Sequence, residues 1–94
     1  MNLNVVNRIH CSGLDLGYPY LPVQLPNIPL INNLTILANS GSTGPIYIGG
    51  SGMTVNNSFQ LNVNAGISLA VDNANLIFCV TQSGYTGKLN WIGN

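Results

Sequence analysis

Short runs of alternating apolar and polar residues occupy most of residues 33–94, with turn residues between them. Successive side chains of a strand point to opposite faces, so alternation indicates a strand with one buried face. The runs read LTILAN, PIYIG, SFQLNVN, ISLAVD, LIFCVTQ and KLNWIG, separated by SGSTG, NAG, DNAN and SGYTG. No helical pattern of convincing length accompanies them. We therefore predict an all-β fold, a small antiparallel β-sandwich or jelly-roll-like barrel of about six strands.

The alternation also predicts which side chains face the core. The residues expected on buried faces are Leu34, Ile36, Ala38, Ile46, Ile48, Phe59, Leu61, Val63, Ile67, Leu69 and Val71. The run LIFCV is apolar on both faces, with Leu76, Phe78 and Val80 on one side and Ile77 and Cys79 on the other. Such a strand belongs in the middle of a sheet or against a partner.

Residues 1–32 lack this alternation and contain four prolines within YPYLPVQLPNIPLI. Proline fixes φ and removes a backbone donor, so a helix or a central strand is not expected there. We predict an extended, proline-rich N-terminal arm over 1–32 and a β-sandwich domain over 33–94. The arm is too apolar to be a solvated linker, and it lies either over its own core or against another subunit. The predicted assembly-interface residues are Tyr18, Tyr20, Leu21, Val23, Leu25, Ile28 and Leu30. Deleting residues 1–31 is expected to leave a soluble sandwich.

Charged residues make up only 4% of this 94-residue chain, against about 25% in typical globular domains. Lys88 and Arg8 are the only cations and lie far apart in the sequence, so we predict no nucleic-acid partner. No stretch reaches the ~18 apolar residues of a membrane span, so we predict no membrane partner. Zero net charge gives copies of the chain no mutual repulsion, which favours a homo-oligomer.

The glycine-rich stretch GGSGMTVNN raises the question of a phosphate-binding loop. Such a loop needs a helix N-terminus and normally a lysine, and this stretch has neither. We interpret it as a structural corner following an edge strand.

Catalytic residues are not predicted. Asp15 and Asp72 lie in unrelated segments, and His10 and Cys11 are neighbours that point to opposite sides of an extended chain. Two cysteines and one histidine are too few for a structural zinc site. We predict a protein that is not an enzyme and has no cofactor and no metal.

Three residues leave alternatives open. Cys11 and Cys79 could form a disulfide, but we favour free thiols because no export signal is evident and the cytosol is reducing. Cys79 is expected to be buried. Trp91 either packs in the core or presents a carbohydrate platform with Tyr47 and Tyr85.

The stretches GPIYIGGSGMTVNNSFQL and NAGISLAVDNANLIFCVT resemble a pattern found in small structural proteins of tailed bacteriophages. The matching positions are Ile46–Gly49, Met53–Thr54, Leu61, Ala65–Gly66, Ser68–Val71, Asp72–Asn73 and Ile77–Phe78. The resemblance covers residues 44–82 and departs at Ala65, where the pattern usually has proline. It implies a virion component assembled in the host cytoplasm, a capsid cement or decoration protein that bridges and stabilises major capsid subunits. Among cement proteins, the preferred state for copies of this chain is a homotrimer. The alternative is a glycan- or host-surface-binding module of a phage tail or fibre.

Overall fold

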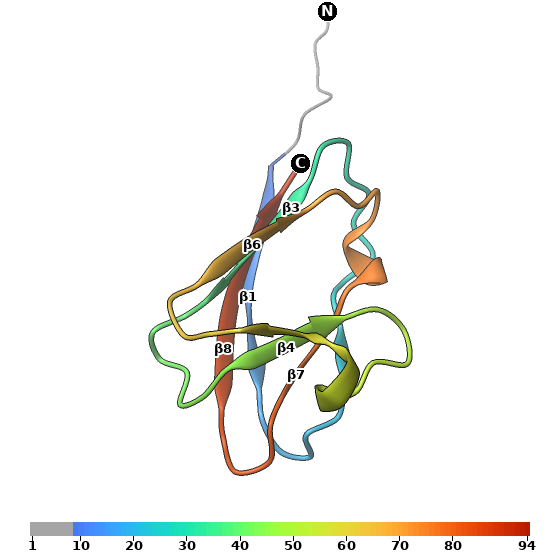
Figure 1. Cartoon of the computed structure of the whole chain (residues 1–94). Coiled ribbons are helices and arrows are strands. Elements are labelled where there is room, and N and C mark those ends of the chain that lie inside the picture. Colours follow the sequence, from blue (N-terminus) through green and yellow to red (C-terminus); the bar gives the residue numbers. More distant parts are fainter. Residues whose placement is uncertain (1–8) are drawn as a thin grey trace, which may run out of the picture.

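The computed structural model describes residues 9–94, which form eight strands and two single-turn 3-10 helices (Figure 1). The strands are β1 (His10–Leu16), β2 (Val23–Gln24), β3 (Leu34–Ala38), β4 (Ile46–Gly49), β5 (Phe59–Leu61), β6 (Gly66–Leu69), β7 (Phe78–Thr81) and β8 (Gly87–Gly93). The helices are η1 (Val55–Asn57), before β5, and η2 (Ala74–Leu76), before β7.

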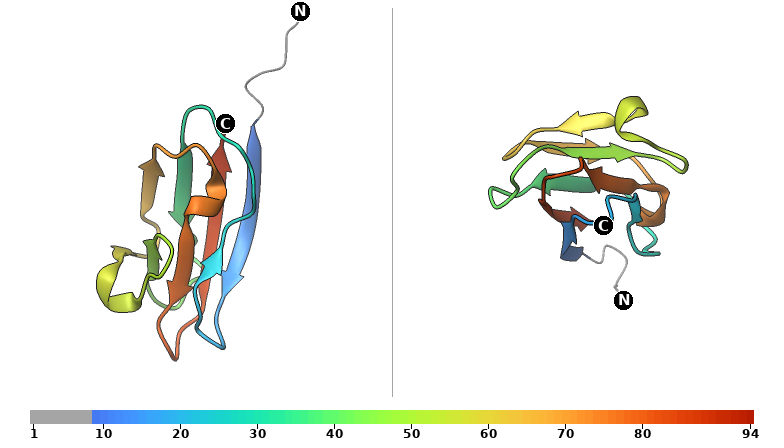
Figure 2. Two further views of the ribbon diagram at one scale, coloured as in Figure 1. Left: turned by 90° about the vertical axis from the view of Figure 1, so that its right-hand side faces the viewer. Right: turned by 90° about the horizontal axis from the view of Figure 1, so that it is seen from below.

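The strands build two antiparallel four-stranded sheets packed as a sandwich (Figure 2). Sheet A has the order β1-β8-β3-β6, and sheet B has the order β2-β7-β4-β5. The predicted all-β sandwich is confirmed. The sheets stay open and do not close into a barrel. The six strands predicted over 33–94 are present as β3 to β8, and two further strands, β1 and β2, come from the segment predicted as an arm.

The core lies between the sheets and is filled from the predicted faces. Leu34, Ile36 and Ala38 of β3 are fully buried, as are Ile46 and Ile48 of β4. Strand β8 alternates strictly between buried and exposed residues along its whole length. The period-2 pattern therefore identified the inward faces of the main strands correctly.

One predicted core position and one predicted strand residue are wrong. Phe59 begins β5, a sheet-end strand covered by only one neighbour, and its side chain is 55% exposed. Leu76 belongs to η2 rather than to a strand, and it is exposed as well. Strand β7 does lie inside its sheet, between β2 and β4, as its two apolar faces predicted.

The segment predicted as an arm is extended, and from residue 10 onward it lies on its own sandwich. Strand β1 pairs with β8 over all seven residues. Leu25 and Leu30 are buried in the main core, and their backbone N–H groups bond to Ile77 O and Asp72 O at 3.0 and 2.9 Å. Residues 10–30 and 33–94 therefore share one core, and residues 1–8 lie outside the described part.

Candidate functional site

Within the part of the chain that the structure describes, the outer face of sheet A is exposed to solvent. Because Leu89 and Trp91 of β8 point inward, the alternate residues Lys88, Asn90 and Ile92 point outward. Strand register aligns these outward positions in two rows across the sheet. One row is Cys11, Ile92, Thr35 and Ser68, and the next is Gly13, Asn90, Leu37 and Gly66.

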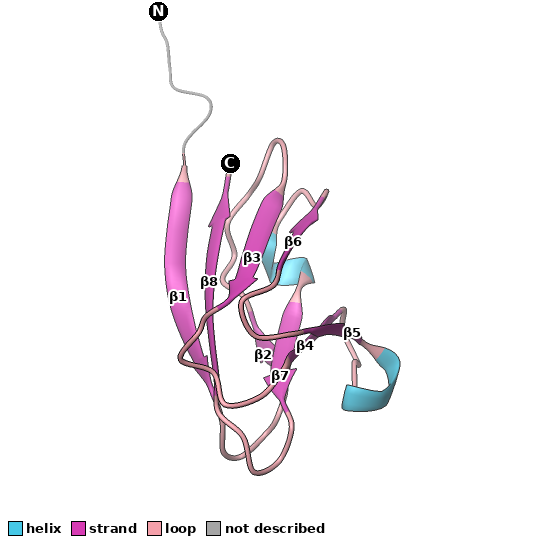
Figure 3. Ribbon diagram, turned by 60° about the vertical axis from the view of Figure 1, so that its left-hand side comes forward, coloured by secondary structure: helices cyan, strands magenta, loops and turns pink. Residues whose placement is uncertain are grey.

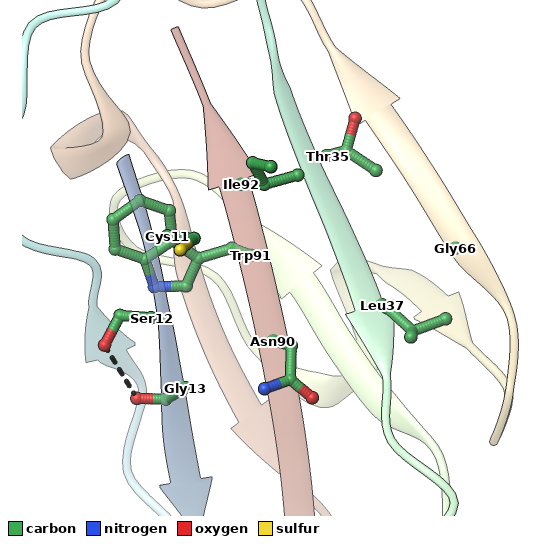
Figure 4. Close-up of a pocket in the computed structure, with 9 residues that line it drawn as sticks. All are labelled: Cys11, Ser12, Gly13, Thr35, Leu37, Gly66, Asn90, Trp91 and Ile92. Carbon is green, nitrogen blue, oxygen red and sulfur yellow. Dashed lines mark hydrogen bonds between the residues drawn. The ribbon is translucent and has the colours of Figure 1, made fainter. Parts of the chain in front are cut away.

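A groove of about 660 Å³ runs over these two rows (Figure 4). Its shape follows from the glycines at both ends of the second row, Gly13 and Gly66, which carry no side chain. A Cβ atom at Gly13 would lie 3.2 Å from Asn90 Nδ2, so a side chain at this position would narrow the groove. Strands β8 and β3 contribute the side chains between them.

Two aliphatic side chains give the groove its apolar character. Ile92 is 48% exposed and Leu37 is 44% exposed, on adjacent strands. They are diagonal neighbours, because Ile92 pairs with Thr35 and Leu37 pairs with Asn90. Contiguous exposed apolar surface with a polar rim marks contact sites when it is large, and these two side chains supply the apolar part of this face.

The polar groups of this face already bond to each other. The hydroxyl oxygens of Thr35 and Ser68 lie 2.8 Å apart, and Asn39 Nδ2 donates to Asn90 Oδ1 at 2.9 Å. Lys88 and Asp15 form an exposed ion pair at 3.8 Å. The face carries no net charge, and its bonded polar groups lower the desolvation cost of covering it.

The outer face of sheet B is covered by its own chain. Tyr47 and Val80 form a second small cluster there with Met53, which the glycine-rich corner brings back over the sheet. Met53 N bonds to Gly50 O at 3.1 Å, and Gly52 takes a positive φ of 79° that glycine adopts without strain. The predicted structural corner is thus present, but the strand before it, β4, is not an edge strand because it lies between β7 and β5.

The candidate chemical groups are dispersed. Asp15 pairs with Lys88 on sheet A, whereas Asp72 lies in the loop before η2. Within residues 9–94, no three His, Cys, Asp or Glu side chains come together as a metal site would require.

Both cysteines are free, with Cys11 exposed on β1 and Cys79 buried on β7, the burial predicted for Cys79. Burial raises the pKa of the Cys79 thiol to about 12, so it is not a nucleophile near neutral pH.

The predicted assembly residues separate into two groups. Leu25 and Leu30 are buried in the core and Ile28 packs against it, so these three serve the monomer. Tyr18 is 89% exposed and packs edge-to-face on Tyr20 with ring centroids 6.0 Å apart. Leu21 and Val23 are also exposed. An assembly contact through the exposed members stays a prediction.

Trp91 is 4% exposed and belongs to the core, so the packed alternative is confirmed. Tyr47 is buried on the other sheet, so the three aromatic residues do not form one platform. Sequence reasoning missed the outer face of sheet A. The available signal was KLNWIG, where placing Trp91 inward puts Ile92 outward.

Comparison with known proteins assigns this chain to no family. No family model and no curated protein matches the chain. A solved structure described under "Bacillus endospore appendages form a novel family of disulfide-linked pili" is similar with a TM-score of 0.49 and 17% identity, over 98% of this chain and 95% of that one. A likeness at this level carries no inference about the role of this chain. Among the described residues, no helix has the length and apolar character needed to cross a bilayer.

Proposed function

We propose that this chain is a non-enzymatic structural subunit that works inside a lasting protein assembly and docks through the outer face of sheet A. The observation that carries the proposal is the neutral groove around Leu37 and Ile92, left open on one sheet while the chain covers the other sheet itself. A surface that is apolar, free of net charge and internally hydrogen-bonded suits a protein partner.

The energy available from this surface is moderate. Fully burying an exposed Leu or Ile side chain contributes about 1.5–3 kcal/mol, so covering the exposed halves of Leu37 and Ile92 contributes roughly 1 kcal/mol each. A stable complex therefore needs further contact area. Tyr18 and Leu21, exposed in the loop after β1, are the predicted source of that area.

The specific form of the proposal is a capsid cement or decoration protein of a bacteriophage virion, bridging major capsid subunits. The resemblance over residues 44–82 supports this partner, and the small number of charges to desolvate supports permanent contact. The glycan-binding alternative is not favoured, because the indole of Trp91 lies in the core rather than on the surface.

The test replaces the two groove side chains with threonine, which keeps strand propensity and adds a hydroxyl. The Leu37→Thr/Ile92→Thr double variant is compared with Phe59→Thr, a matched control because Phe59 is similarly exposed on the other sheet. Light scattering after size-exclusion chromatography is measured for each protein alone and with empty phage capsids.

We expect the wild type and the Phe59→Thr control to assemble and the double variant to lose assembly with unchanged circular dichroism. A wild type that stays monomeric at high concentration and adds to no capsid contradicts the proposal. So does a double variant that assembles like the wild type.

A further inference from the structure

Among the described residues, strand β1 is a long sheet edge that has a partner on one side only. It lies at the end of sheet A, next to β8 (Figure 3). It has seven residues, whereas the other sheet-end strands β6, β2 and β5 have four, two and three. Every second residue of an edge strand turns its backbone N–H and C=O away from the sheet, so β1 offers the longest row of such groups.

Within residues 9–94, this edge lacks most of the usual protective features, and its one charged residue, Asp15, pairs with Lys88 of β8. Natural sheet edges are blunted by proline, lysine, bulges or very short strands. The sequence of β1, HCSGLDL, contains neither proline nor lysine. Its register with β8 runs one to one from His10↔Gly93 to Leu16↔Gly87 without a bulge. The edge is therefore regular enough to accept another strand.

Both faces beside this edge have room for added side chains. The groove on the outer face includes Cys11, Ser12 and Gly13. A second groove of about 370 Å³, on the side where Leu25 and Ile28 lie, is lined by the same three residues. Strand addition combines backbone hydrogen bonds with pockets for alternate side chains, and β1 presents both.

We propose that β1 pairs antiparallel with β1 of a second copy around a two-fold axis at Gly13, which joins the two A sheets into one. Gly13 is the middle residue of β1, so this register pairs all seven residues of each strand. The inference rests on the proposed function and names one partner within the assembly, a copy of the chain itself.

The centred register is compatible with the side chains of β1. It places Gly13 opposite Gly13 of the second copy, so no side chains collide at the axis. Asp15 lies opposite Cys11 of the second copy rather than opposite another carboxylate, and Leu14 lies opposite Ser12. Like charges that face each other across a strand pair are destabilising, and this register avoids them.

The join also enlarges the proposed docking surface. Residues 11 and 13 line the outer groove at the β1 edge. Pairing at Gly13 brings the grooves of the two copies to the same seam, on one continuous sheet face. The isologous contact closes on itself, so it gives a dimer rather than an open chain.

The first experiment places charge at the axis. Gly13→Lys and Gly13→Glu each put like charges opposite each other in the dimer. The new Cβ atom meets only the Asn90 side-chain nitrogen at 3.2 Å and Leu89 O at 3.5 Å, so we expect each variant to fold. In sedimentation equilibrium we expect a dimeric wild type, two monomeric variants, and a dimer on mixing the variants, because the mixture pairs opposite charges.

The second experiment tests the register by cross-linking. Directly opposed residues of an antiparallel pair have Cα atoms about 4.5–5.5 Å apart, within the ~4.4–6.8 Å that a disulfide spans. Under mild oxidation we expect Asp15→Cys to form a covalent dimer through Cys11 of the second copy. The matched control Ser68→Cys, on the opposite sheet end, is expected to remain uncross-linked.

Any one of four results overturns the inference. They are a monomeric wild type, a dimeric Gly13→Lys variant, a mixture of the two charge variants that stays monomeric, and an Asp15→Cys variant that does not cross-link. Failure here is distinguishable from failure of the proposed function. If the wild type is a monomer that still binds capsids, and the Leu37→Thr/Ile92→Thr variant does not bind them, the β1 pairing is refuted. The proposed docking through the outer face of sheet A is then still supported.

Discussion

The backbone N–H of Leu25 donates a hydrogen bond to the carbonyl oxygen of Ile77 at 3.0 Å, and the Leu25 side chain is buried beneath it. This contact joins the proline-rich segment to the start of β7, far along the chain. Residues 10–30 are therefore part of the sandwich and not a separate arm that could be deleted without loss of stability.

Leu25→Ala should therefore destabilise the monomer. Truncating a fully buried leucine costs about 2–5 kcal/mol because it removes apolar burial and leaves a cavity. The matched control is Leu21→Ala, in which an exposed leucine of the same segment is truncated with an expected change within about 0.5 kcal/mol. The free energy of unfolding by urea measures both, and equal values for the two variants would refute the assignment.

Deletion of residues 1–31 should abolish cooperative folding, contrary to the expectation from sequence. The deletion removes β1, β2 and the buried side chains of Leu16, Leu25 and Leu30. Near-ultraviolet circular dichroism and urea titration would show this, and a truncated protein with a native-like unfolding transition would contradict it.

The buried thiol of Cys79 should make stability fall at high pH. Its pKa is raised to about 12 by desolvation, whereas in the unfolded chain it ionises at an ordinary value near 9. The unfolded state therefore releases the proton first, and the contribution to stability is complete below pH 9 and is lost as the pH rises towards 12. Within that window each pH unit costs about 1.4 kcal/mol.

Cys79→Ala is the control for this pH dependence, because it removes only this titration. Between pH 9 and 11 we expect the free energy of unfolding to fall less steeply with pH in the variant. The difference in slope is about 1.4 kcal/mol per pH unit, the value for the release of one proton. Equal slopes in the variant and the wild type would show that Cys79 is not the group responsible.

Gly93→Ala should destabilise the end of β8. A Cβ atom there would lie 2.9 Å from Leu30 Cδ2 and 3.1 Å from the backbone oxygen of Asn33, which cannot rotate away. Overpacking of this kind typically costs about 1–3 kcal/mol. In Gly50→Ala, the matched control, the added methyl group has no atom within 4 Å. Thermal unfolding distinguishes them, and an undiminished transition temperature for Gly93→Ala would count against the close packing at this glycine.

Alternation predicted the strands whose two faces differ strongly in polarity. Leu34, Ile36 and Ala38 are buried as predicted, because a strand with one apolar face has a single favourable orientation. The pattern failed for β1, whose residues Cys11, Ser12 and Gly13 are small and show little contrast between faces. It failed for Phe59 because a regular pattern does not reveal that a strand lies at the end of a sheet.

The candidate site was only partly accessible to sequence reasoning. The low charge and the apolar residues of the predicted arm indicated a contact surface. Of the predicted assembly-interface residues, however, Leu25 and Leu30 are buried in the monomer. The groove around Leu37 and Ile92 joins residues from all four strands of sheet A, and pairing over such sequence distances leaves no local signal.

The sequence alone determined that the chain is a β-sandwich of almost uncharged strands, because side-chain periodicity and ionisable groups are local properties. Tertiary structure decided that the predicted arm completes the core and that sheet B is covered by its own loop. It also decided that, within residues 9–94, sheet A keeps an exposed outer face and ends at β1. Those outcomes depend on which strands pair. Strand pairing in turn depends on how the apolar side chains of the whole chain can be buried together in one small core.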